Sequence, residues 1–432
     1  MLEFNPPVHG TWNIVHIGMA LPEAHQIYVC ADNCMRGVIM TALEMGAGDR
    51  FSCVTLTEQD FYHDNLEEIT IEGVSEVLRE LEKIPPVVLL FTVCVHKFTG
   101  CDLDYVYKGL ARRFPSTHFV RCYMDPISQK EGPTPEEKLR LAMFDPVSEL
   151  TEEKKTVCIL GCDVLQKAGT SDLIDVLSAG GCKVRQLQDC KSFSDYERLG
   201  EGALFICSHP TGRAGVKHLA ERLSRPYVFL PDPFESDAIM TELSEVLETL
   251  RSRSAVELDV ERFSVFMEKK KEAAEASLLH LKTVLQDTPV ALDYTAVTRP
   301  VALASLLLSY GISVRALFLD AVLPEEKDLL TTLEAKYPKL SVYPTIRPNL
   351  RSRVVREKIR REVGSEKVLA IGQKAAWNLN TPYFVNMIEG NGYWGFGGIK
   401  ALAQDMEEAF ANEKDLHDLV PKKGLGCTCV IG

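Results

Sequence analysis

The chain of 432 residues is acidic, with 61 Asp and Glu against 48 Lys and Arg, and 46% of its residues are hydrophobic. At roughly 100 to 200 residues per domain, this length predicts two to four domains, and the ordinary apolar fraction excludes disordered, collagen-like and coiled-coil architectures. The formal net charge of −13 argues against nucleic-acid binding, because such proteins carry a concentrated basic surface. No stretch approaches the ~18 consecutive apolar residues of a membrane span, and the first residues do not resemble a signal peptide. We therefore expect a cytoplasmic protein without a membrane partner.

Short runs rich in Val, Ile, Leu and Phe alternate along the chain with amphipathic helical stretches. The predicted strands are, in order, 87–94, 118–124, 155–161, 183–187, 203–208, 227–230, 290–294, 314–319, 340–344, 368–372 and 383–387. The predicted helices are 75–83, 103–113, 172–179, 215–223, 238–251, 260–286 and 354–363. This alternation is typical of parallel sheets joined by helices. It predicts an α/β fold of three Rossmann-like domains, each a mainly parallel sheet flanked by helices.

Two polar stretches, 145–155 and 252–259, interrupt the pattern and predict the limits of the domains. They give a first domain over 1–152, a second over 153–256 and a third over 257–432. The third ends in the tail GLGCTCVIG, which contains Cys427 and Cys429. A CxC pair in such a tail can bind metal or exchange thiols, and it can equally be inert.

The 13 cysteines point to metal or redox chemistry, because cytosolic thiols stay reduced. The motif IYVCADNCMRG supplies Cys30 and Cys34, and FTVCVHKFTGCDLD supplies Cys94 and Cys101. The strand 87–94 is expected to deliver Cys94 to the carboxyl edge of a sheet, where α/β proteins bind ligands. A helix beginning just after Cys101 should lower the pKa of its thiol. Four thiolates suit an iron–sulfur cluster, although this spacing matches neither a zinc ribbon nor a ferredoxin.

Other cysteines and histidines have a simpler interpretation. Free cysteines behave as small hydrophobic residues and are commonly buried. We expect this of Cys53, Cys122, Cys158, Cys162, Cys182 and Cys190. Near the four candidate ligands, packing or hydrogen bonding is expected of the histidines His16, His25, His63 and His96.

These motifs resemble the first domain of the nitrogenase component 1 family, which includes the molybdenum–iron protein subunits, the dark-operative protochlorophyllide reductase and a nickel-tetrapyrrole reductive cyclase. The stretch SCVTLTEQDFYHDN adds to the match. Three cysteines of that family bind an iron–sulfur cluster at a subunit interface. Cys34 falls on the second and Cys94, 60 residues later, on the third, whereas His9 stands at the first. The resemblance implies Cys34 and Cys94 as ligands, with Cys30, Cys101 or His9 completing the set.

The resemblance extends through the rest of the chain. In ALFICSHPTGRAGVKHLAERL, Cys207 falls on or beside a cysteine that holds the catalytic cofactor of the molybdenum–iron alpha subunit, which implies a possible second metallocofactor near Cys207. In FVNMIEGNGYWGFGGI, Ile388 stands where that subunit has its histidine ligand, so dinitrogen reduction is not expected. The glycines of GYWGFGG form no GxGxxG motif and instead predict a tight turn that brings a helix N-terminus to a cavity, as a possible anion site.

The resemblance therefore implies a nitrogenase-like reductase subunit with an iron–sulfur cluster, [4Fe–4S] or larger. Because the chain has no Walker A motif, an ATP-dependent iron–sulfur reductase would have to supply the electrons. A homodimer or a pair with a related subunit is expected, and the substrate is not identified. Two alternatives stay open. One is a non-catalytic scaffold or carrier for metallocluster assembly. The other is a binding module that has lost its cluster, which is supported by His9 standing at the position of the family's first cysteine.

Overall fold

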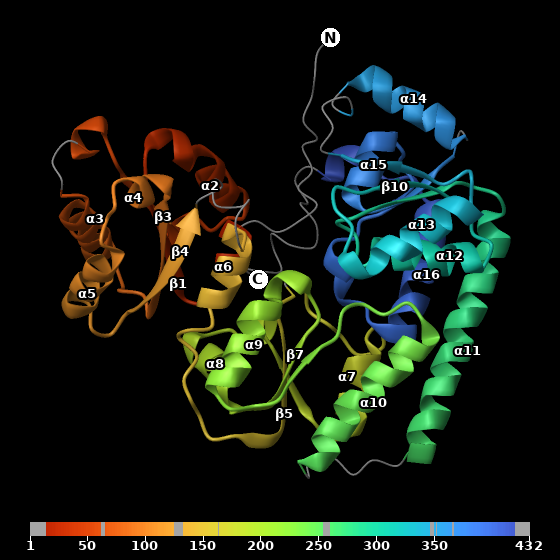
Figure 1. Cartoon of the computed structure of the whole chain (residues 1–432), viewed down its shortest axis with the longest axis horizontal. Coiled ribbons are helices and arrows are strands. Elements are labelled where there is room, and N and C mark those ends of the chain that lie inside the picture. Colours follow the sequence, from red (N-terminus) through yellow and green to blue (C-terminus); the bar gives the residue numbers. More distant parts are fainter. Residues whose placement is uncertain are drawn as a thin grey trace. The chain divides into compact units, whose positions relative to one another are not determined.

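The computed structural model describes residues 14–61, 65–124, 133–162, 164–253, 260–345, 350, 352–364 and 367–419. Three parallel sheets flanked by helices follow one another along the chain, which confirms the predicted α/β class (Figure 1). By internal packing, the described residues form two compact units: the N-terminal unit (14–162 and 185–227) and the C-terminal unit (164–184 and 228–419). No helix in the described ranges is long and apolar enough to cross a bilayer.

The first sheet has the order β2-β1-β3-β4, and each neighbouring pair is parallel. Its elements are α1 (Ile14–Met19), β1 (Ala24–Cys30), α2 (Asp32–Glu44), β2 (Phe51–Thr55), α3 (Leu66–Glu80), β3 (Val87–Val93), α4 (Cys94–Phe98), α5 (Leu103–Arg113), β4 (His118–Met124) and α6 (Pro135–Ala142). Ile27 and Val29 of β1 pack against Ile71 and Val74 of α3, and all four are at most 2% exposed. This apolar layer, together with α5, supports the strands whose carboxyl ends carry the candidate cysteines.

The strands β1 and β2 were not predicted from the sequence pattern. β1 reads AHQIYVC, in which two polar residues interrupt the apolar run although all seven are buried. His25 Nε2 lies 2.8 Å from Ser52 Oγ, Gln26 Nε2 donates to Val15 O at 2.9 Å, and Tyr28 donates to Gln26 Oε1 at 2.9 Å. Buried polar side chains are tolerated when they are hydrogen-bonded in this way. Ser52 lies in β2 and Val15 in α1, so the sequence of β1 alone does not reveal these two partners.

The second sheet has the order β6-β5-β7-β8. Its elements are β5 (Glu153–Leu160), α7 (Asp172–Ala179), β6 (Lys183–Gln186), α8 (Phe193–Glu197), β7 (Gly202–Cys207), α9 (Arg213–Arg222), β8 (Tyr227–Phe229) and α10 (Ser236–Ser252). β5 and β7 are parallel neighbours, and Leu160 lies opposite Cys207 in their register. The strand order changes direction between these two strands, which places Cys207 at a topological switch point.

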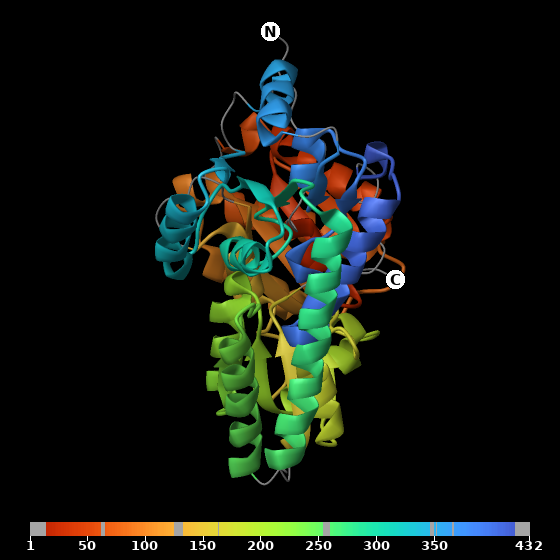
Figure 2. The same cartoon turned by 90° about the vertical axis from the view of Figure 1, so that its right-hand side faces the viewer.

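The third sheet is parallel with the order β11-β10-β9-β12-β13. Its elements are α11 (Val260–Leu285), β9 (Val290–Asp293), α12 (Pro300–Ser309), β10 (Val314–Phe318), α13 (Lys327–Lys336), β11 (Ser341–Tyr343), α14 (Arg353–Val363), β12 (Leu369–Ile371), α15 (Gln373–Leu379), β13 (Phe384–Val385) and α16 (Gly395–Ala411). α14 and α15 share a core with Phe318 and Ala370. α11 is one continuous helix (Figure 2) and packs along α16.

The predicted strands all occur, with ends within two residues of the prediction. The helix predicted at 75–83 begins instead at Leu66, because TIEGVSE and the acidic residues before it continue the amphipathic pattern. The predicted domain limits of 1–152, 153–256 and 257–432 each enclose the strands of one sheet, and β5 begins at Glu153. The limits themselves stay a prediction.

Candidate functional site

The carboxyl edge of the first sheet carries three of the candidate cysteines. Cys30 is the last residue of β1, Cys34 lies in the first turn of α2, and Cys94 begins α4 directly after β3. β1 and β3 are neighbours, with Val29 opposite Thr92, so both strands end at the same edge. The parallel sheet therefore brings Cys34 and Cys94 to one edge although 60 residues separate them in sequence.

The cysteines at this edge differ in their access to solvent. Cys34 is exposed and Cys94 is half-buried, whereas Cys30 is 0% exposed. Burial, and then the neighbouring Cys53, raise the pKa of Cys30 to about 12, and a metal ligand must be a thiolate. Cys34 and Cys94 thus fit an iron–sulfur cluster better than Cys30. Among the described residues, no three His, Cys, Asp or Glu side chains converge as a metal site.

The predicted lowering of the Cys101 pKa is wrong. Asp102 does cap α5, because its Oδ1 accepts from Tyr105 N at 3.0 Å. However, Glu67 of α3 reaches the same place and accepts from Asp102 N at 2.6 Å. Burial, and then the Glu67 carboxylate, raise the pKa of Cys101 to about 12. A thiol in this acidic surrounding is poorly suited to bind metal as a thiolate.

The described histidines near this edge pack as expected. His96 is 2% exposed, and its Nδ1 accepts from Val93 N at 3.3 Å, so it holds the start of α4. Burial lowers the pKa of His96 to about 4. His16 and His25 are also buried. His9 and His63 lie outside the described residues, as do Cys427 and Cys429.

Of the cysteines that we expected in the core, only two are completely buried. Cys122 and Cys158 are 0% exposed, and burial raises both pKa values. The remaining four are half-buried, namely Cys53, Cys162, Cys182 and Cys190. They lie in edge strands or loops, where one side of the residue is left uncovered.

Cys207 ends β7 as predicted but lies in packed protein. The thiol is 0% exposed and donates to His209 O at 3.2 Å. On the neighbouring strand end, Gly161 has φ +83°, and a Cβ there would lie 2.7 Å from Cys207 Sγ. Burial raises the pKa of Cys207 to about 12. A metallocofactor at Cys207 therefore does not fit the described residues as they are packed here, and we derive no reaction step through it.

A polar cluster that we did not predict lies at the carboxyl edge of the third sheet. Lys374 Nζ donates to Tyr294 OH and lies 3.9 Å from Asp320 Oδ2, which in turn accepts from Thr345 Oγ1 at 2.6 Å. Burial lowers the pKa of Lys374, and burial followed by Asp320 raises the pKa of Tyr294. Each of these residues lies within three residues of the end of its strand, namely β9, β10, β11 or β12. Their place after predicted strands, in VALDY and LAIGQK, was a signal that could have identified them.

The glycine-rich turn before α16 approaches its surroundings as closely as predicted, but its anion site is occupied by the protein itself. Gly392 has φ +71°, and a Cβ there would lie 2.2 Å from Leu165 O. At the helix N-terminus, Gly397 N donates to both carboxylate oxygens of Asp172, at 3.1 and 3.2 Å. Lys270 also donates to Asp172, at 2.8 Å. The prediction of a free anion site at this helix is therefore wrong.

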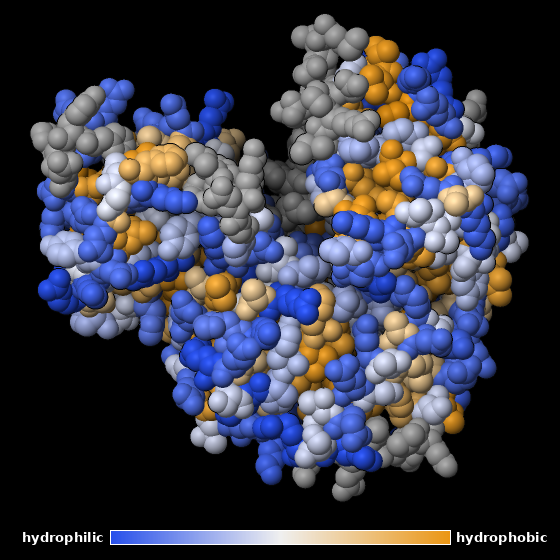
Figure 3. Space-filling view, in the orientation of Figure 1, coloured by the Kyte–Doolittle hydropathy of each residue, from blue (hydrophilic) through white to orange (hydrophobic). Residues whose placement is uncertain are grey.

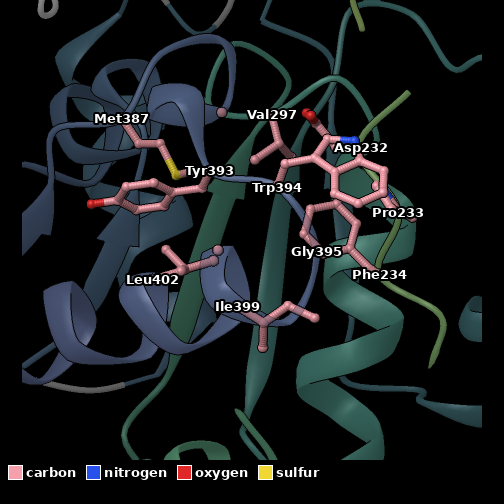
Figure 4. A pocket seen from close by; sticks show the side chains of 12 residues that line it. Asp232, Pro233, Phe234, Val297, Met387, Tyr393, Trp394, Gly395, Ile399 and Leu402 are labelled. Carbon is pink, nitrogen blue, oxygen red and sulfur yellow. The ribbon is translucent and has the colours of Figure 1, made fainter. Parts of the chain in front are cut away.

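A small cavity lies beside this turn in the C-terminal unit. The side chains of Asp232, Met387, Trp394 and Leu402 surround it (Figure 4). Its volume is about 10 Å³, which is room for about one water molecule. Asp232 accepts from Thr298 Oγ1 at 2.7 Å, and burial raises its pKa to about 6. The described lining therefore leaves no space for an organic substrate.

A family model described as "Nitrogenase component 1 type Oxidoreductase" matches residues 33–411. The chain belongs to this family. Among solved structures, "Nitrogenase Cp1 at pH 6.5" matches with a TM-score of 0.64 and 14% identity, over 95% of this chain and 94% of that one. "Nitrogenase Cp1 at pH 5" matches with a TM-score of 0.53 and 14% identity, over 94% and 87% of the two chains. At this identity the likeness concerns the fold. No curated protein matches the sequence.

Membership in the nitrogenase component 1 type family fits the presence of Cys34 and Cys94 at the carboxyl edge of the first sheet. The family consists of oxidoreductases that bind metal–sulfur clusters, work with an ATP-dependent reductase and form oligomers. Ile388, at the position that the sequence comparison assigned to a cofactor histidine, is 1% exposed and has no metal-binding atom. The packed surroundings of Cys207 lead to the same conclusion, because they leave no room for a metallocofactor.

Proposed function

We propose that this chain is a nitrogenase-like reductase subunit whose Cys34 and Cys94 help to hold an iron–sulfur cluster. The observation that carries the proposal is the placement of the exposed Cys34 and the half-buried Cys94 at one sheet edge, beside the buried Cys30 with its raised pKa. The cluster would supply one-electron transfer. A related subunit or a second copy of the chain would supply the ligands that these two thiols leave open.

The chain's own residues would orient and protect the ligands. His96 holds the backbone at Val93, so Cys94 is presented at the start of a fixed helical turn. The packed layer beneath β1 and β3 keeps water from the inner side of this edge. Electrons would come from an ATP-dependent iron–sulfur reductase. The net charge of −13 suits a partner with a basic docking face.

In the C-terminal unit, Lys374 and Tyr294 are the groups that we propose for handling protons in the reduction of the substrate. Burial lowers the pKa of Lys374, which makes its ammonium a better proton donor. Asp320 lies 3.9 Å from its Nζ and keeps the cation in place. The contact between Lys374 and Tyr294 supports a shared role of the two side chains in proton transfer.

The test is anaerobic purification of the full chain with its partner subunit, followed by iron and sulfide analysis and EPR spectroscopy. We expect Cys34→Ser and Cys94→Ser each to lower bound iron by more than half. Cys182→Ser, a half-buried thiol elsewhere in the chain, is the matched control and should keep the wild-type content. Iron below one atom per wild-type chain under strictly anaerobic conditions would refute the proposal.

The second candidate is a scaffold or carrier on which a metallocluster is assembled. The exposure of Cys34 favours it, because cluster transfer requires ligands that an acceptor can reach. Reduction of the bound cluster by an ATP-dependent reductase, followed by turnover of a substrate, would identify a reductase. Transfer of intact cluster to an acceptor protein without turnover would identify a scaffold.

A further inference from the structure

A hollow of about 500 Å³ in the C-terminal unit lies between α14 and the end of α15. Three arginines of α14 line it: Arg353, Arg356 and Arg360. Their spacing of three and four residues places them on one face of the helix. α14 carries four arginines and one lysine against two glutamates, in a chain with a net charge of −13. The helix that lines the hollow is therefore basic, although the chain as a whole is acidic.

Arg356 has the least compensated charge of the lining. Its Nε is buried and has no hydrogen-bond partner among the described residues. The guanidinium lies 5.9 Å from the centre of the Trp377 ring. Burial, and then the nearby Arg353, lower the pKa of Arg356. A half-buried guanidinium whose buried Nε has no acceptor among the described residues favours a ligand that brings an acceptor with negative charge.

The acidic residue in the lining is already engaged. Glu357 accepts from Arg353 Nε at 2.8 Å, and the two side chains form an ion pair across one helical turn. Arg356 and Arg360 face the hollow beside this pair. The lining thus contains one carboxylate against three guanidinium groups.

Asn378 adds a buried acceptor. The residue is 2% exposed, and its Nδ2 donates to Lys374 O at 3.0 Å. Its Oδ1 is buried and has no donor among the described residues. The lining thus requires a ligand with several anionic acceptors and at least one hydrogen-bond donor. A hydrogen phosphate group has both, whereas sulfate at neutral pH has no donor.

We propose that the hollow between α14 and α15 binds the phosphate group of a small molecule. Arg356 and Arg360 bind its oxygens, Asn378 Oδ1 accepts from a hydroxyl group of the ligand, and the Trp377 ring contacts any organic part. Guanidinium forks match the geometry of phosphate oxygens. In Figure 3 the surface around α14, at the upper right, mixes hydrophilic and hydrophobic residues, which suits a ligand with a charged and an apolar part. The site belongs to the C-terminal unit and uses none of the candidate cluster ligands.

The test measures binding of inorganic phosphate, AMP, adenosine and sulfate to the full chain by isothermal titration calorimetry at constant ionic strength. We expect phosphate or AMP to bind with millimolar or better affinity, and sulfate and adenosine at least fivefold more weakly. AMP at least fivefold tighter than phosphate identifies an organic phosphate as the ligand. Equal affinities identify the free ion. Both results support the site.

Matched variants locate the binding. Arg356→Gln should weaken phosphate or AMP at least tenfold, whereas Arg361→Gln, the same charge change on an exposed residue of the same helix that does not line the hollow, should change it less than twofold. If Arg356→Gln does not fold, Arg360→Gln replaces it and should show a loss of at least fivefold. Equal losses in Arg361→Gln, sulfate binding as tight as phosphate, or no phosphate binding at 20 mM would each overturn the proposal.

Discussion

The carboxylate of Asp172 accepts hydrogen bonds from the backbone N–H of Gly397, which lies 225 residues further along the chain. Asp172 is 0% exposed, and Lys270 donates to it at 2.8 Å. The same contact includes a backbone bond from Asp172 N to Trp394 O at 3.0 Å. The C-terminal unit therefore uses a buried charge from its short segment, residues 164–184, to cap the helix α16.

Replacing this cap should destabilise the C-terminal unit strongly. We expect Asp172→Ala to lower the free energy of unfolding by about 2–4 kcal/mol, because it leaves the α16 N-terminus and the Lys270 ammonium without their anion. Urea unfolding followed by tryptophan fluorescence measures the loss. Asp287→Ala removes a fully exposed carboxylate that lies 3.5 Å from Lys282, and it should lower the free energy of unfolding far less than Asp172→Ala. Equal costs in the two variants would contradict the capping role.

Thiol alkylation should distinguish the cysteines at the first sheet edge. In the cluster-free chain, we expect Cys34 to react with iodoacetamide at least tenfold faster than Cys30, Cys101 and Cys207, because Cys34 is exposed and the other three have pKa values near 12. Peptide mass spectrometry over time gives the rates. Reconstitution with a cluster should protect Cys34 and Cys94 and leave Cys182 unchanged. Fast labelling of Cys30 would contradict the burial described here.

Glu242 should make the chain less stable as the pH rises. Burial raises the pKa of its carboxyl to about 8, partly offset by Arg299. Between about pH 4.5 and 8 the unfolded chain releases this proton while the folded chain keeps it, so stability falls with rising pH. At pH 8, Glu242→Gln should be about 1 kcal/mol more stable than wild type, a value reduced for partial exposure. At pH 4.5 the two should be equal, and thermal unfolding at both pH values measures this. A constant difference would contradict the shift.

His25 should make the chain sensitive to acid. The residue is 4% exposed, and burial lowers the pKa of its imidazole to about 4. Below about pH 6.5 the unfolded chain binds a proton that the folded chain excludes, so this contribution to stability is lost as the pH falls towards 4. We expect a loss of about 2 kcal/mol at pH 5 relative to pH 7. His25→Gln can still bond Ser52 and does not titrate. If wild type and this variant lose the same stability, the assignment to His25 is wrong.

The carboxyl edge of the first sheet shows how much of the candidate site could be predicted from the sequence. The strand ending at Cys94 was predicted because VVLLFTV is an uninterrupted apolar run, and the family motifs selected Cys34 as its companion. β1, which separates β2 from β3 and carries Cys30, was missed because His25 and Gln26 interrupt its pattern. The pKa of Cys101 was predicted from its helix alone, whereas burial and then the Glu67 carboxylate on α3 raise it.

The sequence by itself determined the family, the α/β class and the positions of the predicted strands, because these depend on local apolar patterns and on motifs of a few residues. Tertiary structure decided which polar groups meet. It brought Asp172 to the N-terminus of α16, closed Cys207 against Gly161, assembled Lys374 with Tyr294, and left Arg356 without a bonded anion among the described residues. Burial and charge act through space, and the environment of each of these groups is set by segments distant in the chain.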